Sequence, residues 1–350
     1  MRRGDSELLS FSCNDYLGLA RHPDVIQASL DATRRHGAGA GASRLVTGNS
    51  SLYRHLETQL GRLKGTEDAV VFASGYLTNV GVVPALAGRE DLILIDELSH
   101  TCLFAGATLA RGKVLMFRHK DIAQAEALLR EHRPSYRHCL VLTDGVFSMD
   151  GDRAPVAELL EISNRYDAWL MTDDAHGLGV VEDGRGSSIV NGVGMPVPLQ
   201  MGTLSKAVGA YGGYLCTSRA VADLIRNRAR SLIYTTGLPP GTVAAATRAL
   251  EIIQSDKTRV RAPMERARLF TEMLGMPAPE SAIVPILIGD PARTLEVSRA
   301  LEMSGFLVVG IRPPTVPEGT ARLRITFSAE HEEEDVRNLA AAVADALEIR

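Results

Sequence analysis

The sequence lacks any apolar run near the roughly 20 residues that are needed to span a bilayer. Its first residues, MRRGDSELLSF, also lack the apolar core of a signal peptide. Cysteine is scarce, and Cys13, Cys102, Cys139 and Cys216 have neither zinc-site nor redox-pair spacing. We therefore expect no membrane partner, no metal, and buried free thiols in a cytoplasmic protein.

The chain also lacks a large excess of charge of either sign. The formal net charge is −4 and the basic residues are scattered along the chain. Local pairs such as Arg34 and Arg35 are expected on solvated helix faces. The sequence therefore predicts no nucleic-acid partner.

Short apolar runs alternate with helical patterns as far as Pro240. This alternation predicts a mostly parallel sheet covered by helices on both faces. The glycine-rich segment 36–50 is expected to be a loop. The expected strands are 69–73, 92–95, 114–117, 139–143, 168–172, 199–203 and 214–216. The expected helices are 23–35, 51–63, one that follows the turn 74–76 and runs to about Leu86, 121–131 and 155–166.

After Pro240 the pattern is that of a smaller α+β domain. Its expected helices are 241–254, 261–274, 291–304 and 332–349, and its expected strands are 282–288, 306–311 and 321–327. We expect the chain to divide into an N-terminal segment 1–35 that packs with the small domain, a large domain 36–240 and a C-terminal small domain 241–350.

Polar side chains gather where the predicted strands end. In open α/β sheets, ligands bind beyond the carboxyl ends of the strands. The sequence therefore predicts one site that contains His100, Ser148, Asp173, His176, Thr203 and Lys206.

Lys206 stands among small and hydroxylated residues, in the segment TLSK. A surface lysine is the ordinary alternative. A strand-end acid, a nearby histidine and a later lysine are, however, what a pyridoxal phosphate enzyme needs, because the lysine forms a Schiff base and the acid pairs with the pyridine nitrogen. Thr203 and Ser205 could donate hydrogen bonds to the phosphate. Near cationic groups of the cofactor the pKa of the Lys206 amine would fall, which frees it as nucleophile and base.

Asp173 and Asp174 are adjacent at a strand end, so their side chains point to opposite sides. We expect Asp173 to pair with the ring nitrogen and Asp174 to be a solvated turn acid. His176 and Ser148 could bind the phenolic oxygen, and His100 could stack on the ring. For each lone histidine a structural role is the alternative.

Two further segments suggest anion sites, and a third resembles such a site only superficially. Ser74, Gly75 and Tyr76 join a strand to a helix start, which is either a phosphate site or an ordinary turn. Arg322 and Arg324 share one face of a strand, where they could bind a carboxylate or lie in water at an edge. The run GAGAGA resembles a dinucleotide fingerprint only superficially, because it follows a helix and not a strand.

A series of motifs occurs in order along the chain: SCNDYLGL, SGY, LSH, GVFSMDGD, DDAHGLG, TLSK and IYTTGLPP. Together they resemble the α-oxoamine synthases, which use pyridoxal 5'-phosphate and have the aspartate-aminotransferase fold (fold type I). That fold has a large cofactor-binding domain with a mostly parallel sheet and a smaller α+β C-terminal domain. The resemblance extends from about Phe11 to the C-terminus.

The resemblance implies roles for particular residues. Lys206 would carry the aldimine, Asp173 would pair with the pyridine nitrogen, and His100 would stack on the ring. The ring oxygen would be bound by His176 and Ser148, and the remaining cofactor contacts would come from Gly75, Tyr76, Thr203 and Ser205. The family forms homodimers, in which Thr235 or Thr236 would reach the phosphate of the neighbouring subunit. The substrate residues would be Asn14 and Arg324 for the amino-acid carboxylate and Thr315 for the acyl donor.

The segment IRPPTVPEGTARLRI resembles the branch of the family that condenses L-alanine with a pimeloyl thioester in biotin biosynthesis. One alternative is a sister enzyme that uses glycine or serine, such as a glycine C-acetyltransferase or a 5-aminolevulinate synthase. Another is a non-catalytic partner subunit, against which Lys206 argues. A NAD-linked oxidoreductase is the remaining alternative.

One departure from the family pattern concerns the N-terminus. Family members carry a helical segment before the NDYLGL motif, and that segment contributes an arginine to the acyl-donor site. This sequence starts almost at the motif. We therefore expect either weaker acyl-donor binding or a truncated chain start.

Overall fold

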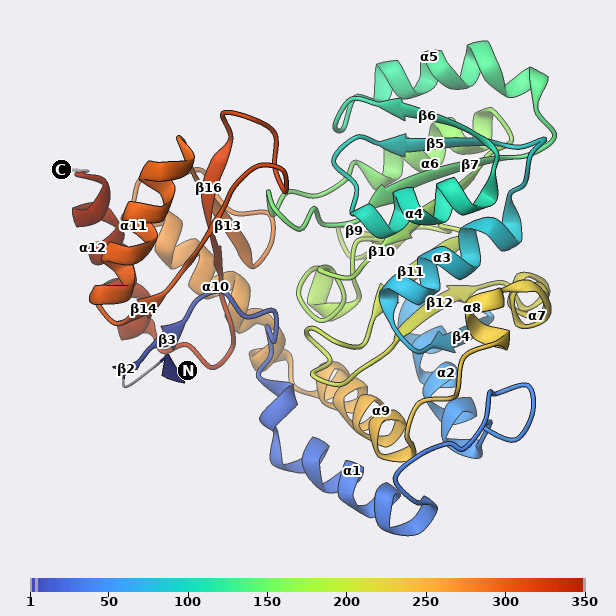
Figure 1. Ribbon diagram of the computed structural model, residues 1–350, viewed down its shortest axis with the longest axis horizontal. Coiled ribbons are helices and arrows are strands. Elements are labelled where there is room, and N and C mark those ends of the chain that lie inside the picture. Colours follow the sequence, from blue (N-terminus) through green and yellow to red (C-terminus); the bar gives the residue numbers. More distant parts are fainter. Residues whose placement is uncertain (1, 4–5, 349–350) are drawn as a thin grey trace. The chain divides into compact units, whose positions relative to one another are not determined.

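The computed structural model describes residues 2–3 and 6–348 (Figure 1). Its chain forms two compact units. The larger unit contains residues 19–147 and 153–256. The smaller unit contains the chain up to Gly18, the short segment 148–152 and the chain from Lys257 onward.

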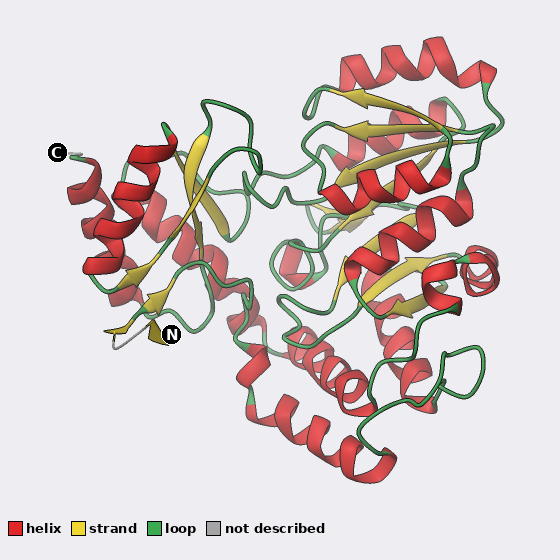
Figure 2. Ribbon diagram, viewed as in Figure 1, coloured by secondary structure: helices red, strands yellow, loops and turns green. Residues whose placement is uncertain are grey.

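The larger unit is built on a seven-stranded sheet with the order β4-β12-β11-β8-β7-β5-β6. Strands are yellow and helices red in Figure 2. Its strands are β4 (Asp68–Phe72), β5 (Leu92–Asp96), β6 (Lys113–Phe117), β7 (Cys139–Asp144), β8 (Trp169–Asp173), β11 (Leu199–Thr203) and β12 (Gly213–Thr217). All neighbours from β11 to β6 are parallel, and β12 is antiparallel to β11 and β4. The prediction of a mostly parallel sheet is confirmed.

Helices cover both faces of this sheet. Successive residues of a strand point to opposite faces, and on β5 Ile93 and Ile95 enter one core while Leu92 and Leu94 enter the other. The first core is closed by α3 (Gly75–Leu86), α4 (Thr101–Ala110), α7 (Arg219–Arg228) and α8 (Arg230–Ile233). The second is closed by α5 (Ile122–His132) and α6 (Val156–Arg165).

Some elements of the larger unit were not expected from the sequence. Helix α4 has the sequence TCLFAGATLA, in which apolar residues leave no clear polar face, so the helical period is weak. Helix α7 has a start signal, because the Ser218 hydroxyl accepts a hydrogen bond from Val221 N. The short elements are η1 (Leu19–Arg21), η2 (Arg133–Ser135), η3 (Glu182–Gly184), β9 (Ile189–Val190) and β10 (Val193–Gly194).

The smaller unit has an antiparallel sheet with the order β13-β16-β15. Its strands are β13 (Ile283–Gly289), β15 (Val309–Ile311) and β16 (Ala321–Thr326), and its helices are α10 (Lys257–Met273), α11 (Pro291–Met303) and α12 (Glu333–Leu347). The helix expected over 332–349 extends past the described residues, so position 349 is not assessed. Two short strands, β1 (Arg2–Arg3) and β2 (Ser6–Glu7), pair with each other.

The single strand expected over 306–311 is wrong, because the chain changes partners within it. Strand β14 (Phe306–Leu307) pairs in parallel with β3 (Leu9–Ser10), whereas β15 pairs with β16. Between them the Ser12 hydroxyl accepts a hydrogen bond from Val309 N at 2.9 Å. The apolar run 306–311 therefore contributes one strand to each of two different sheets.

The unit boundaries differ from the expected 1–35, 36–240 and 241–350. Helix α1 (Pro23–His36) packs on α9 (Pro240–Ser255), and both belong to the larger unit. A side chain at Gly241 would collide with Ser29 and Thr33 of α1, so glycine permits this close packing. Helix α9 also packs on α2 (Ser51–Lys64). The first and last expected segments are thus divided between the units.

Candidate active site

The predicted lysine and one predicted histidine are brought together in the larger unit. Lys206 follows β11, and its Nζ lies 2.8 Å from Nε2 of His176, which is buried in the turn after β8. Lys206 itself is half-buried. An amine that shares a hydrogen bond with an imidazole can exchange a proton with it, so this pair is suited to acid–base chemistry.

Asp173 ends β8 as a buried carboxylate that is held by two nitrogen donors and, at 3.9 Å, by the thiol of Cys102. Its Oδ1 accepts from Ala175 N at 3.0 Å, and its Oδ2 accepts from Asn79 Nδ2 at 2.8 Å. Burial raises the pKa of Asp173, and Lys206, Asn79 and His100 oppose that rise. Burial of a carboxylate is costly unless charges and donors offset it, and a protonated pyridine nitrogen would add a positive charge to that of Lys206. The site therefore fits pyridoxal phosphate.

His100 is the N-cap residue of α4 and is exposed. Its Nδ1 lies 2.8 Å from Sγ of Cys102, and its backbone N–H donates to Asp144 Oδ1 at 3.1 Å. Partial burial lowers the pKa of His100, with Asp173 acting in the opposite direction. Burial and the neighbouring Asp173 raise the pKa of Asp144 well above its usual range. A neutral, exposed imidazole is suited to stacking on a ring.

The expectation that Asp174 is a solvated turn acid is wrong. Asp174 is fully buried and forms an ion pair with Lys64 Nζ at 2.6 Å, and Lys64 is equally buried. Lys64 also donates to the carbonyl of Arg185, and Ser187 N donates to Asp174. Alternation along the strand does send Asp173 and Asp174 to different sides, but both sides are interior.

The residues expected at a phosphate lie where α3 begins. A Cβ on Gly75 would approach Cβ of Thr203 to 3.4 Å, so the first turn of α3 adjoins the end of β11. Helix N-termini attract anions. The Thr203 and Ser205 hydroxyls both donate to the carbonyl of Gly212 here, so neither is free to donate in this arrangement. Tyr76 is 54% exposed.

Thr235 and Thr236 lie on the segment that follows α8. Thr236 forms an isolated bridge with Ser43, and Gly237 N donates to the carbonyl of Ala42. These two segments therefore run side by side, and Thr236 is exposed.

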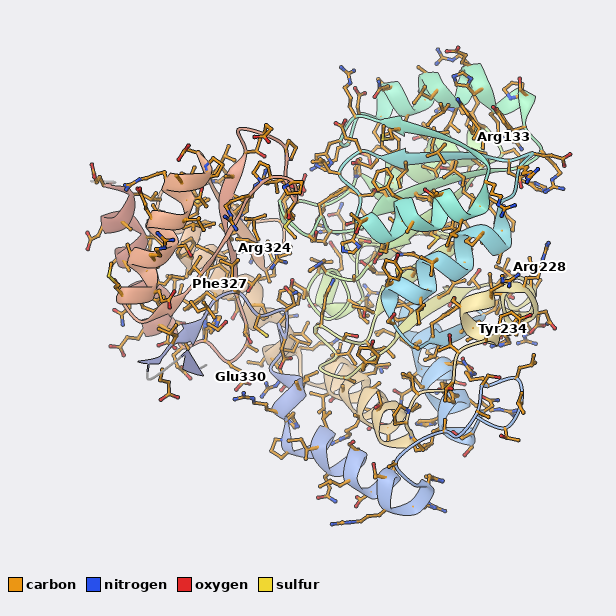
Figure 3. All side chains as sticks on the ribbon, viewed as in Figure 1. Arg133, Arg228, Tyr234, Arg324, Phe327 and Glu330 are labelled. Carbon is orange, nitrogen blue, oxygen red and sulfur yellow. The ribbon has the colours of Figure 1, made fainter. Side chains whose placement is uncertain are left out.

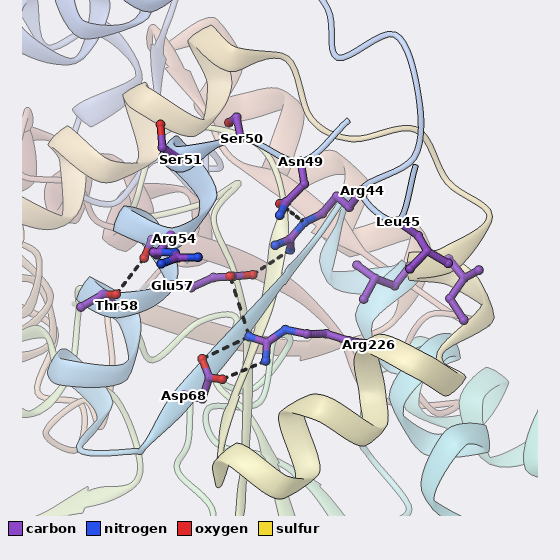
Figure 4. A pocket seen from close by; sticks show the side chains of 12 residues that line it. Arg44, Leu45, Asn49, Ser50, Ser51, Arg54, Glu57, Thr58, Asp68 and Arg226 are labelled. Carbon is purple, nitrogen blue, oxygen red and sulfur yellow. Dashed lines mark hydrogen bonds and ion pairs between the residues drawn. The ribbon is translucent and has the colours of Figure 1, made fainter. Parts of the chain in front are cut away.

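A cavity of about 830 Å³ lies near these segments and contains none of the predicted site residues. Four of its charged side chains pair with one another: Arg44 lies 2.7 Å from Glu57, and Arg226 lies 2.8 Å from Asp68 (Figure 4). Leu45, which also lines it, is 67% exposed.

Arg324 belongs to the smaller unit and is buried on the central strand β16 (Figure 3). Its Nε donates to the carbonyl of Ser148, and its Nη1 donates to Asn14 Oδ1 at 3.1 Å. Its Nη2 is buried without a hydrogen-bond partner among the described residues. Arg322 on the same strand is buried against Asp150. The reading of both arginines as solvated edge residues is therefore wrong.

The sequence missed several residues beside the predicted ones. Asn79, Cys102 and Asp144 surround Asp173 and His100, and Lys64 pairs with Asp174. None of them belongs to a motif with a chemical signature, and Asn79 and Cys102 lie inside helices. Cys102, Cys139 and Cys216 are buried as expected, but Cys13 is exposed, which corrects that expectation. Thr315 is exposed, and its backbone N–H donates a hydrogen bond to the carbonyl of Arg312 in the same turn.

Two features are absent from the described part of the chain. None of its helices combines the length and the apolarity that crossing a membrane requires. It also contains no group of three or more histidine, cysteine, aspartate or glutamate side chains that could hold a metal ion.

Residues 6–343 match the family model for class I and II aminotransferases. A putative 8-amino-7-oxononanoate synthase from Acidiphilium cryptum is 58% identical over 99% of this chain and 90% of its own length. An 8-amino-7-oxononanoate synthase from Methylocella silvestris is 57% identical over 99% of both chains.

Solved structures give the same picture of the fold. A serine palmitoyltransferase from S. paucimobilis, with a bound pyridoxal phosphate–myriocin aldimine, superimposes with a TM-score of 0.94. It is 28% identical, and the match covers 98% of this chain and 88% of that one. An 8-amino-7-oxononanoate synthase from Francisella tularensis has a TM-score of 0.83 at 22% identity, covering 97% and 98%. The second of these supports the fold alone.

Proposed function

This chain belongs to the α-oxoamine synthases within the class I and II aminotransferase family, and we propose that it condenses L-alanine with a pimeloyl thioester. The products are 8-amino-7-oxononanoate, carbon dioxide and the free thiol, as part of biotin biosynthesis. The enzyme is an acyltransferase, and its cofactor is pyridoxal phosphate. The observation that carries the reaction is the identity of 56–58% to several 8-amino-7-oxononanoate synthases over nearly the whole chain.

The bound cofactor acts as an electron sink for the carbanion that forms when an amino acid loses its α-proton. In our proposal the Asp173 carboxylate balances the charge of the ring nitrogen, and its burial supports this role. Lys206 Nζ would hold the cofactor until alanine displaces it, and the freed amine would then accept the α-proton of alanine. His176 Nε2, at 2.8 Å, takes part in handling that proton. His100 covers the ring with its exposed face.

A carbon–carbon bond then forms between the alanine α-carbon and the thioester carbonyl, and the thiol leaves. The alanine carboxylate leaves as carbon dioxide, and a proton replaces it. We propose that Arg324 and Asn14 bind this carboxylate before it leaves. The buried Nη2 of Arg324 supports the assignment, because a guanidinium donor without a partner is suited to a carboxylate. We also assign Thr315 to the acyl donor and Ser148 to the ring oxygen.

At the other end of the cofactor, we propose that the first turn of α3, with Gly75 and Tyr76, binds the phosphate. Thr203 and Ser205 contribute there once their hydroxyls turn away from the Gly212 carbonyl. A rotation of two side chains is enough for this change, because a hydroxyl hydrogen can reorient.

We further propose that the enzyme is a homodimer in the cytoplasm, with Thr235 and Thr236 at the phosphate of the neighbouring subunit. Leu45, Val46 and Tyr234 support an interface, because they are large apolar side chains that are 67%, 74% and 75% exposed. They flank the paired segments around Ser43 and Thr236.

The reaction is tested by mixing the purified enzyme, loaded with pyridoxal phosphate, with L-alanine and pimeloyl-CoA. We expect thiol release and formation of 8-amino-7-oxononanoate, detected by mass spectrometry. Glycine and serine in place of alanine test the sister enzymes, and pimeloyl carrier protein in place of the CoA ester tests the other donor. Faster turnover with glycine or serine, or no thiol release with either donor, would overturn the proposal.

Lys206 is tested separately. Borohydride reduction of the loaded enzyme should fix the cofactor mass on the peptide that contains Lys206, and Lys206→Ala should lower kcat by about 10³-fold or more. Lys113→Ala, at an exposed lysine of β6, is the matched control and should leave both results unchanged.

A further inference from the structure

The side chain of Asn79 is completely buried in α3, yet only part of it is satisfied. Its Nδ2 donates to Asp173 Oδ2 at 2.8 Å and to Cys102 Sγ at 3.0 Å, which uses both amide hydrogens. Its Oδ1 is buried without a hydrogen-bond partner among the described residues. An unsatisfied buried oxygen costs stability, so folding alone gives no reason for an amide at this position.

The orientation of the Asn79 amide follows from its neighbour. An ionised carboxylate only accepts hydrogen bonds, so the amide must turn its NH₂ group towards Asp173 and leave its oxygen unpaired. The protonated Cys102 thiol is compatible with the second contact, because burial raises its pKa to about 12. The amide is therefore fixed in the one orientation that serves Asp173.

The backbone around Asn79 is also held closely. A side chain at Gly106 of α4 would approach the carbonyl oxygen of Asn79 to 2.6 Å, so α4 packs directly on this part of α3. Asn79 lies four residues after Gly75, and residues four apart share one face of a helix. A single rigid helix thus carries both the predicted phosphate turn and the donor to Asp173.

We infer that Asn79 is a positioning residue: its amide holds the Asp173 carboxylate in place and keeps it a weak enough base to leave the proton on the pyridine nitrogen of the cofactor. The inference rests on the proposed function in one respect, namely that pyridoxal phosphate binds with its ring nitrogen at Asp173. A carboxylate that loses a donor becomes a stronger base, so it takes a larger share of the proton between itself and the ring. The direction agrees with the lowering of the Asp173 pKa by Asn79.

The test compares Asn79→Leu, which is close in size but has no donor, with Cys102→Ala, which removes the other acceptor of the same amide and leaves the bond to Asp173. Two quantities are measured: the dissociation constant of pyridoxal phosphate from the apoenzyme, and the ¹⁵N chemical shift of cofactor labelled at the ring nitrogen. For Asn79→Leu we expect affinity to fall about 10- to 100-fold and the ¹⁵N shift to move towards that of an unprotonated pyridine.

Cys102→Ala should change the affinity by less than about threefold and leave the ¹⁵N shift nearly unchanged, since the Cys102 thiol donates to Asp173 Oδ2 only at 3.9 Å and a thiol is a weak donor. If Asn79→Leu does not fold, Asn79→Ala decides, because it removes the same donor without adding a charge and should move the ¹⁵N shift in the same direction. Unchanged ¹⁵N shifts in the Asn79 variants, or equal changes in Cys102→Ala, overturn the inference while wild-type turnover leaves the proposed function intact. A wild-type enzyme that does not bind the cofactor overturns both.

Discussion

At the scale of single residues, the hydrogen bonding of a side chain's polar atoms distinguishes a binding role from a structural role better than the residue type does. Arg324 shows this, because two of its three nitrogens are engaged with Ser148 and Asn14 while Nη2 is buried and unpaired in the described chain. His331 shows the opposite case, in which both ring nitrogens are engaged.

Replacing Arg324 by lysine keeps the charge but removes the planar pair of donors. We expect Arg324→Lys to raise the KM for L-alanine about 10- to 100-fold, because hydrogen bonds to charged groups are among the strongest. Steady-state thiol release measures the effect. Arg337→Gln, at an exposed arginine of α12, should leave the KM unchanged. An unaltered alanine KM in Arg324→Lys would contradict the assignment.

His331 predicts a pH dependence of stability. Its Nδ1 accepts from Ser328 N at 3.1 Å and its Nε2 lies 3.0 Å from the Ser10 carbonyl, so the folded state requires the neutral ring. Burial lowers its pKa. The stabilisation is therefore present above the unfolded pKa of about 6.5 and is lost as the pH falls below it.

Urea unfolding on both sides of that pH measures this. The free energy of unfolding should fall by up to about 1.4 kcal/mol per pH unit from this residue. The slope should be smaller in His331→Gln, whereas His36→Gln, at an exposed position, should retain it. Equal slopes in wild type and His331→Gln would refute the prediction.

At the scale of elements, buried ion pairs connect the ends of helices and strands near the site. Lys64 in the last turn of α2 pairs with Asp174 just after β8 and also donates to the Arg185 carbonyl. The pair fixes the strand end that bears Asp173. Helix α3 acts similarly, because one helix carries both Gly75 and Asn79.

Removing one partner of the pair leaves a buried charge. We expect Lys64→Met to lower the free energy of unfolding by about 3–5 kcal/mol, and Lys64→Met with Asp174→Leu to recover at least half of that loss. Lys113→Met on the surface should change it by less than about 0.5 kcal/mol. Denaturant unfolding of all three variants provides the measurement. A Lys64→Met variant as stable as the wild type would contradict the prediction.

At the scale of the whole molecule, the proposed dimer depends on apolar side chains that one chain leaves exposed. We expect Val46→Glu to raise the dimer dissociation constant at least about 100-fold, because a charge buried in an apolar interface is strongly unfavourable. Sedimentation across a concentration series measures it. Met303→Glu is the matched control, since Met303 is 85% exposed on α11 of the smaller unit. Dissociation by both variants alike, or by neither, would argue against this interface.

The sequence by itself determined the alternation of strands and helices, the parallel sheet, and the lysine and acid at strand ends, because hydrophobic periodicity and strand-end placement are local properties of the chain. Its motifs also carried the family resemblance. It could not reveal that Asp174 is buried on Lys64 or that one apolar run, 306–311, serves two sheets, because each outcome depends on a partner distant in sequence.

Only the tertiary structure decided which helix packs where and which polar atoms remain unsatisfied. Helices α1 and α9 share a unit because Gly241 lets them approach closely, although more than 200 residues separate them. Asn79 reaches Asp173 across 94 positions of the chain. Contacts of this kind arise from packing of distant segments, and no pattern of neighbouring residues encodes them.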